Sequence, residues 1–426
     1  MPTFSRRQFI TTASLAAVGT VAAVRPGEHG AQHDTYFQGL QAALRQAGVG
    51  SPTLVIDRER LQANAQQVMH NIGGRMQLRL VNKSLPCLPL LDALMQLTGS
   101  QRQMVFSLPY LQLLTQQRPQ VDVLLGKPMP VAAAAQFYAR RAASSFDPAQ
   151  QLQWLVDTPQ RLQQYRDLAR AQKQAMRINI EIDVGLHRGG VADEATLQAM
   201  IQLLQSEPLL QWSGLMGYDP HTEKIPDLPG VRQQARDQAK AAYQRISRIM
   251  QASPLAKPAR QLTLNTAGSP TYRLHDGTGA ANEVSIGSAM VKPTDFDTPL
   301  LSDLTAACFI ATPVIKSGPF QAPDGVEWIG KLAKLWDANQ RHGVYIYGGH
   351  WLAQPVSPAG LAPSGLIGPS SNQQLLVGSG QQALQPDDFV FMRPTQSEAV
   401  LQQFGDIAVY SQGRITDWWP VFPAQA

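Results

Sequence analysis

Features that mark disulfide-rich, metal-binding or membrane-spanning proteins are scarce in this sequence. Only two of its 426 residues are cysteine, Cys87 and Cys308, and their separation fits no metal motif, so we expect two buried thiols rather than a disulfide. His221, His275 and His350 are scattered along the chain, and their spacing predicts no metal site. Beyond the N-terminus, no apolar run is long enough to suggest a transmembrane helix.

Signatures of nucleotide and nucleic-acid binding are also missing. The chain has no P-loop, no dinucleotide-binding glycine pattern and no Gly-x-Ser-x-Gly elbow. Its formal net charge is +5, but no dense stripe of Lys and Arg runs along it, so we expect no nucleic-acid partner. A hydrophobic fraction of 44% with 16% charged residues describes a globular protein, and the length predicts two domains.

The N-terminus resembles a twin-arginine export signal. Ser5-Arg6-Arg7-Gln8-Phe9 lies near the start of the chain, and a weakly apolar, charge-free stretch follows from residue 10 to residue 24. This pattern predicts a signal and linker over residues 1–34, and a periplasmic protein with no membrane contact beyond the signal. No clean Ala-x-Ala site precedes Arg25, which leaves an uncleaved membrane anchor as the alternative.

From residue 35 to residue 285, short apolar runs alternate with helical patterns. Repeated alternation of this kind favours a parallel sheet closed into a (β/α)8 barrel, the TIM-barrel fold. Asp57 and Thr158 stand at expected helix N-cap positions, and Pro159 follows in a first turn. The predicted strands cover residues 53–56, 76–81, 104–106, 121–125, 152–156, 178–184, 212–217 and 262–265.

Helical periodicity fades beyond residue 285. Short strand-like runs replace it at residues 307–314, 343–347, 389–392, 407–410 and 415–418, and Gly and Pro gather between them. We therefore predict a second, mostly β domain over residues 286–426. The expected fold class is α/β, with an N-terminal (β/α)8 barrel over residues 35–285 followed by this β domain.

Lys83 comes directly after the apolar run that contains Leu78 and Leu80, and a helix-like segment follows it. In a (β/α)8 barrel, catalytic residues lie where the strands end. A lysine at such a position can form a Schiff base with a carbonyl cofactor. Taken alone, it is more often a solvated surface residue, so the interpretation depends on the motifs that follow.

Two of these motifs come after predicted strands. In the segment from Glu181 to Gly190, with the sequence EIDVGLHRGG, the glycines permit a tight turn and the close approach of a ligand. Arg188 can hold a phenolate or carboxylate oxygen, or it can pair with Asp183. Tyr218 ends another strand, where it can contact a cofactor ring or simply fill the barrel rim.

A third motif is small and polar. The segment from Asn265 to Tyr272, NTAGSPTY, follows a predicted strand and exposes backbone N–H groups that can bind a phosphate. The Gly-Ser pair at residues 287 and 288 can complete such a site or turn the chain into the second domain. The candidate phosphate-binding residues are Gly268, Ser269, Thr271 and Ser288.

Together these motifs resemble the D-threonine aldolase and D-serine dehydratase-like family of pyridoxal phosphate enzymes. The resemblance spans roughly residues 50–420, and residues 181–191 match the family pattern almost residue for residue. It implies the fold of alanine racemases, a homodimer, a small amino acid of D configuration as substrate, and Lys83 as the Schiff-base lysine. It also implies that Arg188 holds the phenolate oxygen of pyridoxal 5'-phosphate, that Tyr218 contacts the ring, and that Gly268, Ser269, Thr271 and Ser288 hold the phosphate.

The chain departs from this family where a metal would bind. The family's Pro-Asn-His-x-Cys/Asp pattern corresponds to Pro394-Thr395-Gln396-Ser397-Glu398, so both expected ligands are replaced. Gln396 and Glu398 can hold a hard ion such as Mg²⁺ or Mn²⁺ but make a poor zinc site, which puts a divalent metal in doubt.

Three functions remain open on the sequence. The first is a lyase, either an aldolase or a dehydratase, that acts on a D-β-hydroxy amino acid. The second is an amino-acid racemase or epimerase, which needs no metal but needs a second base that the sequence does not place. The third is a binding protein that keeps the scaffold without the chemistry.

Overall fold

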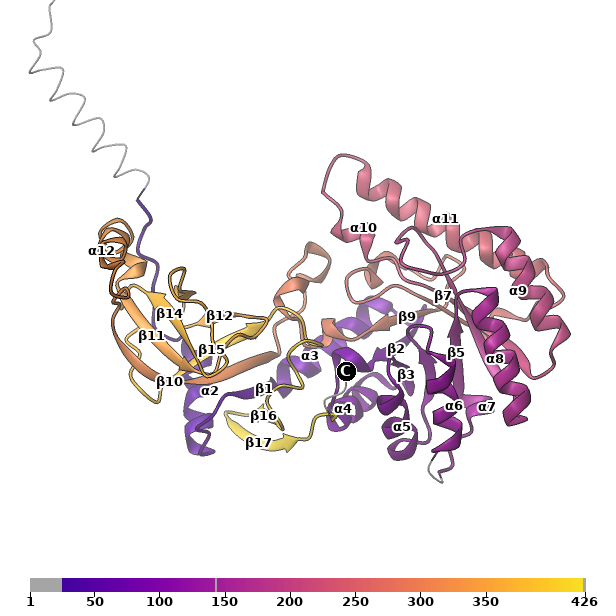
Figure 1. Ribbon diagram of the computed structural model, residues 1–426, viewed down its shortest axis with the longest axis horizontal. Helices are drawn as coiled ribbons and strands as arrows, with labels where there is room; N and C mark the ends of the chain where they lie inside the picture. The colour runs from indigo at the N-terminus through magenta and orange to yellow at the C-terminus, as the bar shows by residue number, and fades with distance from the viewer. Residues whose placement is uncertain (1–24, 142–143, 424–426) are drawn as a thin grey trace, which may run out of the picture. The chain divides into compact units, whose positions relative to one another are not determined.

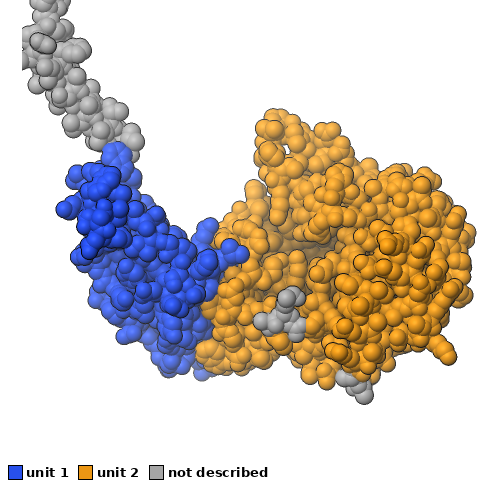
Figure 2. Space-filling view, in the orientation of Figure 1, with its two compact units in different colours: residues 1–55, 309–394, 412–415 blue, residues 56–308, 395–411, 416–426 orange. Residues whose placement is uncertain are grey.

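A computed structural model describes residues 25–141 and 144–423. The predicted export signal lies outside these residues. The chain divides into two compact units, which Figure 2 colours separately. Unit 1 comprises Met1–Val55, Phe309–Pro394 and Gln412–Ile415, and unit 2 comprises Ile56–Cys308, Thr395–Ser411 and Thr416–Ala426. Each unit is therefore assembled from separate stretches of the chain, and no single boundary at residue 285 divides them.

Unit 2 contains a closed barrel of eight parallel strands in sequence order, with helices outside it (Figure 1). The strands are β2 (Gln77–Val81), β3 (Arg102–Val105), β4 (Asp122–Leu125), β5 (Leu152–Val156), β6 (Met176–Ile182), β7 (Leu210–Gly217), β8 (Thr263–Thr266) and β9 (Glu283–Ile286). The longer helices are α3 (Arg58–Ile72), α4 (Leu88–Thr98), α5 (Leu108–Gln117), α6 (Val131–Ala139), α8 (Pro159–Gln172), α9 (Glu194–Ser206) and α11 (Val231–Ala252). The predicted α/β class, a TIM barrel with a mostly β second part, is confirmed.

Local signals fix where these helices begin. The Asp57 side chain accepts a hydrogen bond from the Arg60 N–H at the start of α3, which leaves one fewer helix donor unsatisfied. Thr158 caps α8 in the same way, and Pro159 occupies the first turn. Both predicted caps are confirmed. The face of α3 that is buried carries residues spaced three and four apart, namely Leu61, Ala65, Val68 and Ile72.

One predicted barrel strand lies in the other sheet, and one strand of the barrel was not predicted. The run at residues 53–56 forms β1 (Thr53–Asp57), which is not a barrel strand but lies in a separate sheet between β10 and β16. A continuously apolar run fits the centre of either sheet, so its pattern does not say which one it joins. The barrel is instead closed by β9, which pairs with β2 and β8. In β9 the polar Glu283 and Ser285 make hydrogen bonds to Arg79 and Asn265, respectively.

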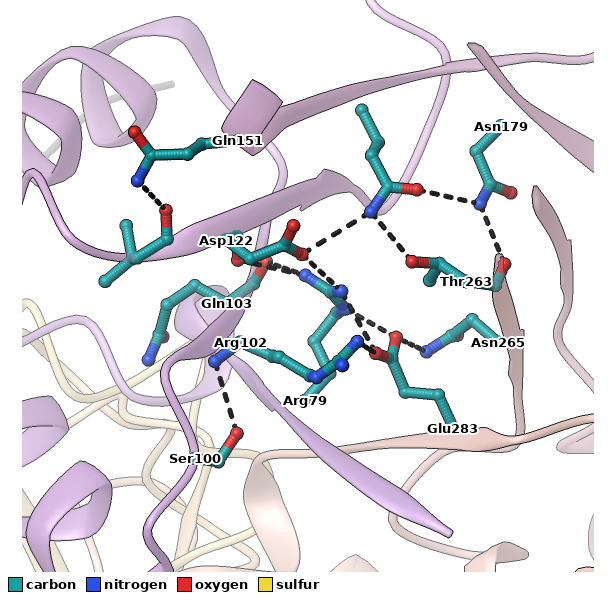
Figure 3. Close-up of polar contacts among 12 residues, drawn as sticks. Arg79, Ser100, Arg102, Gln103, Asp122, Gln151, Asn179, Thr263, Asn265 and Glu283 are labelled. Carbon is teal, nitrogen blue, oxygen red and sulfur yellow. Dashed lines mark hydrogen bonds and ion pairs between the residues drawn. The ribbon is translucent and has the colours of Figure 1, made fainter. Parts of the chain in front are cut away.

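The interior of the barrel is charged rather than apolar at one level (Figure 3). Arg79 on β2 is fully buried, and its guanidinium donates to Glu283 Oε1 at 2.5 Å and to Asp122 Oδ1 at 2.6 Å. Arg102 adds a second contact to Glu283 at 2.8 Å. Asn265 donates to Glu283 at 2.7 Å, and so connects this charged layer to the next residues along β8 and β9.

The second sheet has nine strands, in the order β13-β14-β11-β10-β1-β16-β17, and β15 pairs with both β10 and β12. Its remaining strands are β10 (Cys308–Pro319), β11 (His342–Tyr347), β12 (Ala353–Ser357), β13 (Ala362–Pro363), β14 (Gln373–Gly378), β15 (Phe389–Pro394), β16 (Ile407–Ser411) and β17 (Arg414–Trp419). In unit 1, α2 (Thr35–Gln46) packs on this sheet through Phe37. The centroid of its ring lies 4.9 Å from that of Phe391 and 5.3 Å from that of Phe309.

Cys87 and Cys308 are both buried and free, as the sequence predicted. Burial raises the pKa of each thiol to about 12, so both are protonated at neutral pH. Among residues 25–141 and 144–423, no helix is both long and apolar enough to cross a bilayer.

Candidate active site

A cavity of about 670 Å³ opens in unit 2 where the barrel strands end. Its lining includes the residue that directly follows each of six strands, together with Lys83, Glu181, Arg188 and Glu398. Those six residues are Phe106, Gly126, Asp157, Tyr218, Ala267 and Gly287, after β3, β4, β5, β7, β8 and β9. Because parallel strands all end on the same side of a closed barrel, side chains far apart in sequence meet here.

Lys83 lies in a short 3-10 turn, Asn82–Ser84, two residues beyond the end of β2. Its side chain is 43% exposed, and its Nζ lies 3.5 Å from Glu398 Oε1. The same ammonium lies 4.9 Å from the centroid of the Phe106 ring, which shields one side of it. Lys83 is therefore held at the wall of the cavity with its amine accessible.

The carboxylate of Glu398 is surrounded by hydroxyl groups. Ser288 and Ser397 donate to Oε2 at 3.3 and 3.0 Å, and Ser84 donates to Oε1 at 3.4 Å. Burial alone would raise the pKa of Glu398, but its own backbone N–H, the Lys83 ammonium and the Ser397 hydroxyl outweigh it and lower the pKa. Glu398 is thus the ionised counter-charge of Lys83.

Arg188 lies over the ring of Tyr218 in the cavity wall, with its guanidinium carbon 5.1 Å from the ring centroid. Asp183, the alternative partner, instead accepts hydrogen bonds from the N–H groups of Gly185 and His187 and contacts the His187 ring at 2.7 Å. This tight turn directs the chain so that Arg188 and Gly189 line the cavity.

The loop after β8 is organised by hydroxyl groups. Ser269 Oγ accepts from the N–H groups of Gly287 and Ala289, both at 3.1 Å, and so joins the loop to the end of β9. Thr271 donates to Asp219 Oδ1 at 2.6 Å, and Asp219 Oδ2 contacts His275 Nε2 at 2.8 Å. Thr271 is buried away from the cavity lining, so it supports the loop from behind.

Most of the predicted site residues meet at this one cavity, but two do not. Thr271 is one, and Gln396 is the other: its exposed side chain donates to Asp295 at 2.9 Å. Gln396 and Glu398 therefore have different partners. In the described part of the chain, no three His, Cys, Asp or Glu side chains gather as a metal site would require. The predicted residues that line the cavity are Lys83, Arg188, Tyr218, Gly268, Ser269, Ser288 and Glu398.

Sequence reasoning missed a pair of carboxylates in the same cavity. A methyl group built on Gly189 would lie 4.0 Å from both Asp157 Oδ2 and Glu181 Oε2, so the two acids converge on one point. Burial and the charge of Asp157 raise the pKa of Glu181 to about 7, against the opposing effect of Arg188. The sequence did carry a signal for each acid: Asp157 directly follows the strand β5, and Glu181 begins the EIDVGLHRGG motif.

The raised pKa of Glu181 predicts a pH dependence of stability. In the unfolded chain this carboxyl has its ordinary value of 4.5, and in the folded protein about 7. Between these values the folded state binds more protons, so the free energy of unfolding falls as pH rises, by about 3 kcal/mol at most. Urea unfolding of the cofactor-free protein across this range should show that slope, and Glu181→Gln should remove it. Glu194→Gln, on an exposed first turn of α9, is the control and should keep it; equal slopes in both variants would contradict the assignment.

Comparison with known proteins identifies the family of this chain. Residues 56–295, more than half of the chain, match the model of the alanine racemase N-terminal domain. The chain belongs to this family. The family is pyridoxal phosphate dependent and has the architecture known as fold type III, in agreement with the barrel and the lysine at its rim. No curated protein matches the sequence.

Solved structures agree on the fold. D-threonine aldolase from Filomicrobium marinum superposes with a TM-score of 0.69 at 18% identity, over 87% of this chain and 97% of that one. D-threo-3-hydroxyaspartate dehydratase from Delftia sp. HT23 gives 0.69 at 18% identity, over 88% and 98%. Alanine racemase from Bacillus anthracis gives 0.64 at 13% identity, over 87% and 98%. These similarities establish the fold, which is shared by enzymes of different reaction types.

Proposed function

We propose that this protein is a pyridoxal phosphate enzyme that attaches its cofactor through Lys83 and acts as a lyase on a D-β-hydroxy amino acid. The observation that carries the proposal is the convergence of Lys83, Arg188, Tyr218 and the Gly268–Ser269 loop on one cavity at the strand ends of a family barrel. Its volume of about 670 Å³ lies within the range of small-molecule sites and can hold a cofactor together with a small amino acid.

The residues present fit this cofactor. Small side chains at Gly268, Ser269, Gly287 and Ser288 leave room for a phosphate where β8 and β9 end. Gly268 shows how tight the fit is, because a Cβ built on it would lie 2.5 Å from Cε2 of Tyr218. The same cavity contains the exposed amine of Lys83, where a carbonyl can be bound covalently.

Gly268→Ala should therefore weaken cofactor binding. The added methyl group cannot coexist with the present Tyr218 ring position, and overpacking of this kind costs about 1–3 kcal/mol, or roughly fivefold to a hundredfold in affinity. Fluorescence titration with pyridoxal phosphate measures the change. Gly279→Ala is the matched control, since nothing lies within 4 Å of a Cβ there. Unchanged affinity in Gly268→Ala would place the cofactor elsewhere.

The charged side chains have distinct roles in the proposed reaction. Bound pyridoxal phosphate supplies an electron sink that stabilises negative charge at the substrate α-carbon. Arg188 contributes positive charge opposite Tyr218, and Glu398 balances the Lys83 amine whenever that amine carries a proton. Glu181, with a pKa of about 7, can accept or donate a proton at neutral pH. It would accept the proton of the β-hydroxyl in Cα–Cβ cleavage by an aldolase, or donate a proton to that hydroxyl so that it leaves as water in a dehydratase.

A substrate assay tests the reaction class. Holoenzyme incubated with D-threonine should release glycine and acetaldehyde if it is an aldolase, and with D-serine pyruvate and ammonia if it is a dehydratase. Each assay is run with added Mn²⁺ and with a chelator, and the L-amino acids serve as the stereochemical control. Absence of aldehyde and of keto acid from both D-substrates, with cofactor bound, would refute the lyase proposal.

A racemase is the second candidate, and one observation favours it. Racemisation needs two acid–base groups, and the cavity contains Glu181 with its raised pKa in addition to Lys83. Loss of optical rotation from D-alanine or D-serine, without keto acid, would select this reaction. Glu181→Gln would then block proton exchange at the α-carbon, which deuterium incorporation measures directly.

We also propose that the protein acts in the periplasm and as a homodimer. The twin-arginine motif at Arg6 and Arg7 supports export, and the family resemblance supports the dimer. Cell fractionation of wild type against an Arg6→Lys/Arg7→Lys variant tests the first, and light scattering of the purified protein tests the second. Cytoplasmic retention of both proteins, or a monomeric mass, would refute the respective statement.

A further inference from the structure

The helix α12 (Glu327–Trp336) in unit 1 exposes its large apolar side chains instead of burying them. Trp328, Leu332, Leu335 and Trp336 are 62%, 56%, 72% and 41% exposed. With about 100° of rotation per residue, these four positions fall within a single arc of about 100°. The residue of the helix that is buried is Gly330, and a Cβ on it would lie 2.6 Å from that of Ala322. The apolar stripe therefore faces outward.

The first described residues of the chain run along the end of this helix, as Figure 1 shows. Arg25 Nε donates to the carbonyl oxygen of Trp336 at 2.9 Å. Asn339 accepts from the His29 N–H at 3.2 Å and donates to the Gly27 carbonyl at 2.8 Å. Arg25 directly follows the charge-free stretch from residue 10 to residue 24. The point where that apolar stretch joins unit 1 is thus adjacent to the exposed face of α12.

We propose that the exposed face of α12 docks on the surface of a lipid bilayer, beside the N-terminal stretch. A helix with apolar residues on one face and lysines next to it lies in the interface and does not cross the membrane. Tryptophan, which α12 carries near both ends, is the residue most enriched at that depth. Lys331 is exposed at the border of the apolar arc, where it can reach lipid headgroups.

A lipid bilayer is favoured over a protein partner because α12 lies beside the point where the apolar N-terminal stretch joins unit 1. If residues 10–24 insert in or lie against a bilayer, the hydrogen bond between Arg25 and Trp336 keeps the apolar face of α12 close to the same bilayer. Covering that face then requires no further component. The sequence predicted no membrane contact beyond the export signal, so α12 adds a second contact. Docking of α12 would attach the protein to the bilayer whether or not the proposed reaction takes place at Lys83.

Quenching of tryptophan fluorescence by brominated lipids tests the docking. The full chain is reconstituted in phosphatidylethanolamine–phosphatidylglycerol vesicles with brominated acyl chains, which quench only indole rings that reach the bilayer. Wild type should be quenched, and Trp328→Phe/Trp336→Phe should lose most of that quenching. Trp418→Phe is the matched control, because Trp418 is 43% exposed but lies outside α12, and it should be quenched like wild type.

A second pair of variants keeps all tryptophans. Leu332→Glu/Leu335→Glu places two charges in the apolar arc and should abolish the quenching, since each exposed leucine contributes about tenfold to interfacial partitioning. Leu228→Glu, at a position 58% exposed in unit 2, should not change it. Quenching that persists in both double variants would overturn the proposal. Absent quenching in wild type, with a light-scattering mass that falls in Leu332→Glu/Leu335→Glu, would overturn it in favour of a second copy of the chain.

Discussion

Lys83→Ala is expected to lose covalent attachment of pyridoxal phosphate and at least about a thousandfold of the activity of the wild-type enzyme. In the proposed reaction the amine both binds the cofactor carbonyl and acts as a base, and proton transfer alone contributes about 10²–10⁴ in rate. Borohydride reduction followed by mass spectrometry should find the cofactor on the peptide containing Lys83 in wild type and nowhere in the variant.

The cavity itself supplies a matched control for this experiment. Lys127 also lines it and is exposed, but it lies after β4 and, among residues 25–141 and 144–423, makes no ion pair like that of Lys83 with Glu398. Lys127→Ala should keep the trapped cofactor and most of the activity. Circular dichroism of both variants should match wild type, because neither side chain is buried. Cofactor trapped equally in Lys83→Ala would move the attachment site and refute the assignment.

Much of this site was predictable because the barrel turns sequence position into spatial position. Lys83, Tyr218, Gly268 and Ser288 each come shortly after a strand, and the residues after successive parallel strands must converge. The pattern could not say which group each side chain contacts. From spacing alone Arg188 could pair with Asp183 or line the cavity; in the structure Asp183 contacts His187, and Arg188 lines the cavity.

What the sequence could not show depends on contacts between distant segments. Thr271 belongs to the predicted phosphate loop, yet its hydroxyl is used by Asp219, from the segment after β7. The raised pKa of Glu181 depends partly on Asp157, from the end of the neighbouring strand β5. Likewise β9 was not recognised as a strand because its polar Glu283 and Ser285 serve the barrel interior. A linear pattern carries no record of such partners.

The buried ionic layer formed by Arg79, Glu283 and Asp122 is expected to have a large effect on the free energy of unfolding. Arg79 is fully buried, and it is stabilised by Glu283, by Asp122 and by the carbonyl oxygens of Gln103 and Asp122 at 3.0 Å each (Figure 3). Burial opposes its charge, but the two carboxylates outweigh this and raise its pKa. A buried charge that loses its partner pays the full desolvation penalty, so the layer is far more sensitive to single changes than its net stability suggests.

Arg79→Met should therefore destabilise the protein by about 3–5 kcal/mol, because Glu283 keeps only Arg102 as a cationic partner. Arg166→Met, which breaks the surface pair with Asp167, is the control and should cost less than about 1 kcal/mol. Urea unfolding followed by circular dichroism measures both. The double variant Arg79→Met/Glu283→Leu should be less destabilised than the sum of its single variants, since it removes both charges together. Additive losses, or an Arg79→Met variant as stable as the control, would show that the layer is not electrostatically coupled.

Because Asn265 bonds to both Glu283 and Ser285, and Asn265 and Ser285 line the cavity, the same coupling should appear as weaker cofactor binding in Glu283→Leu.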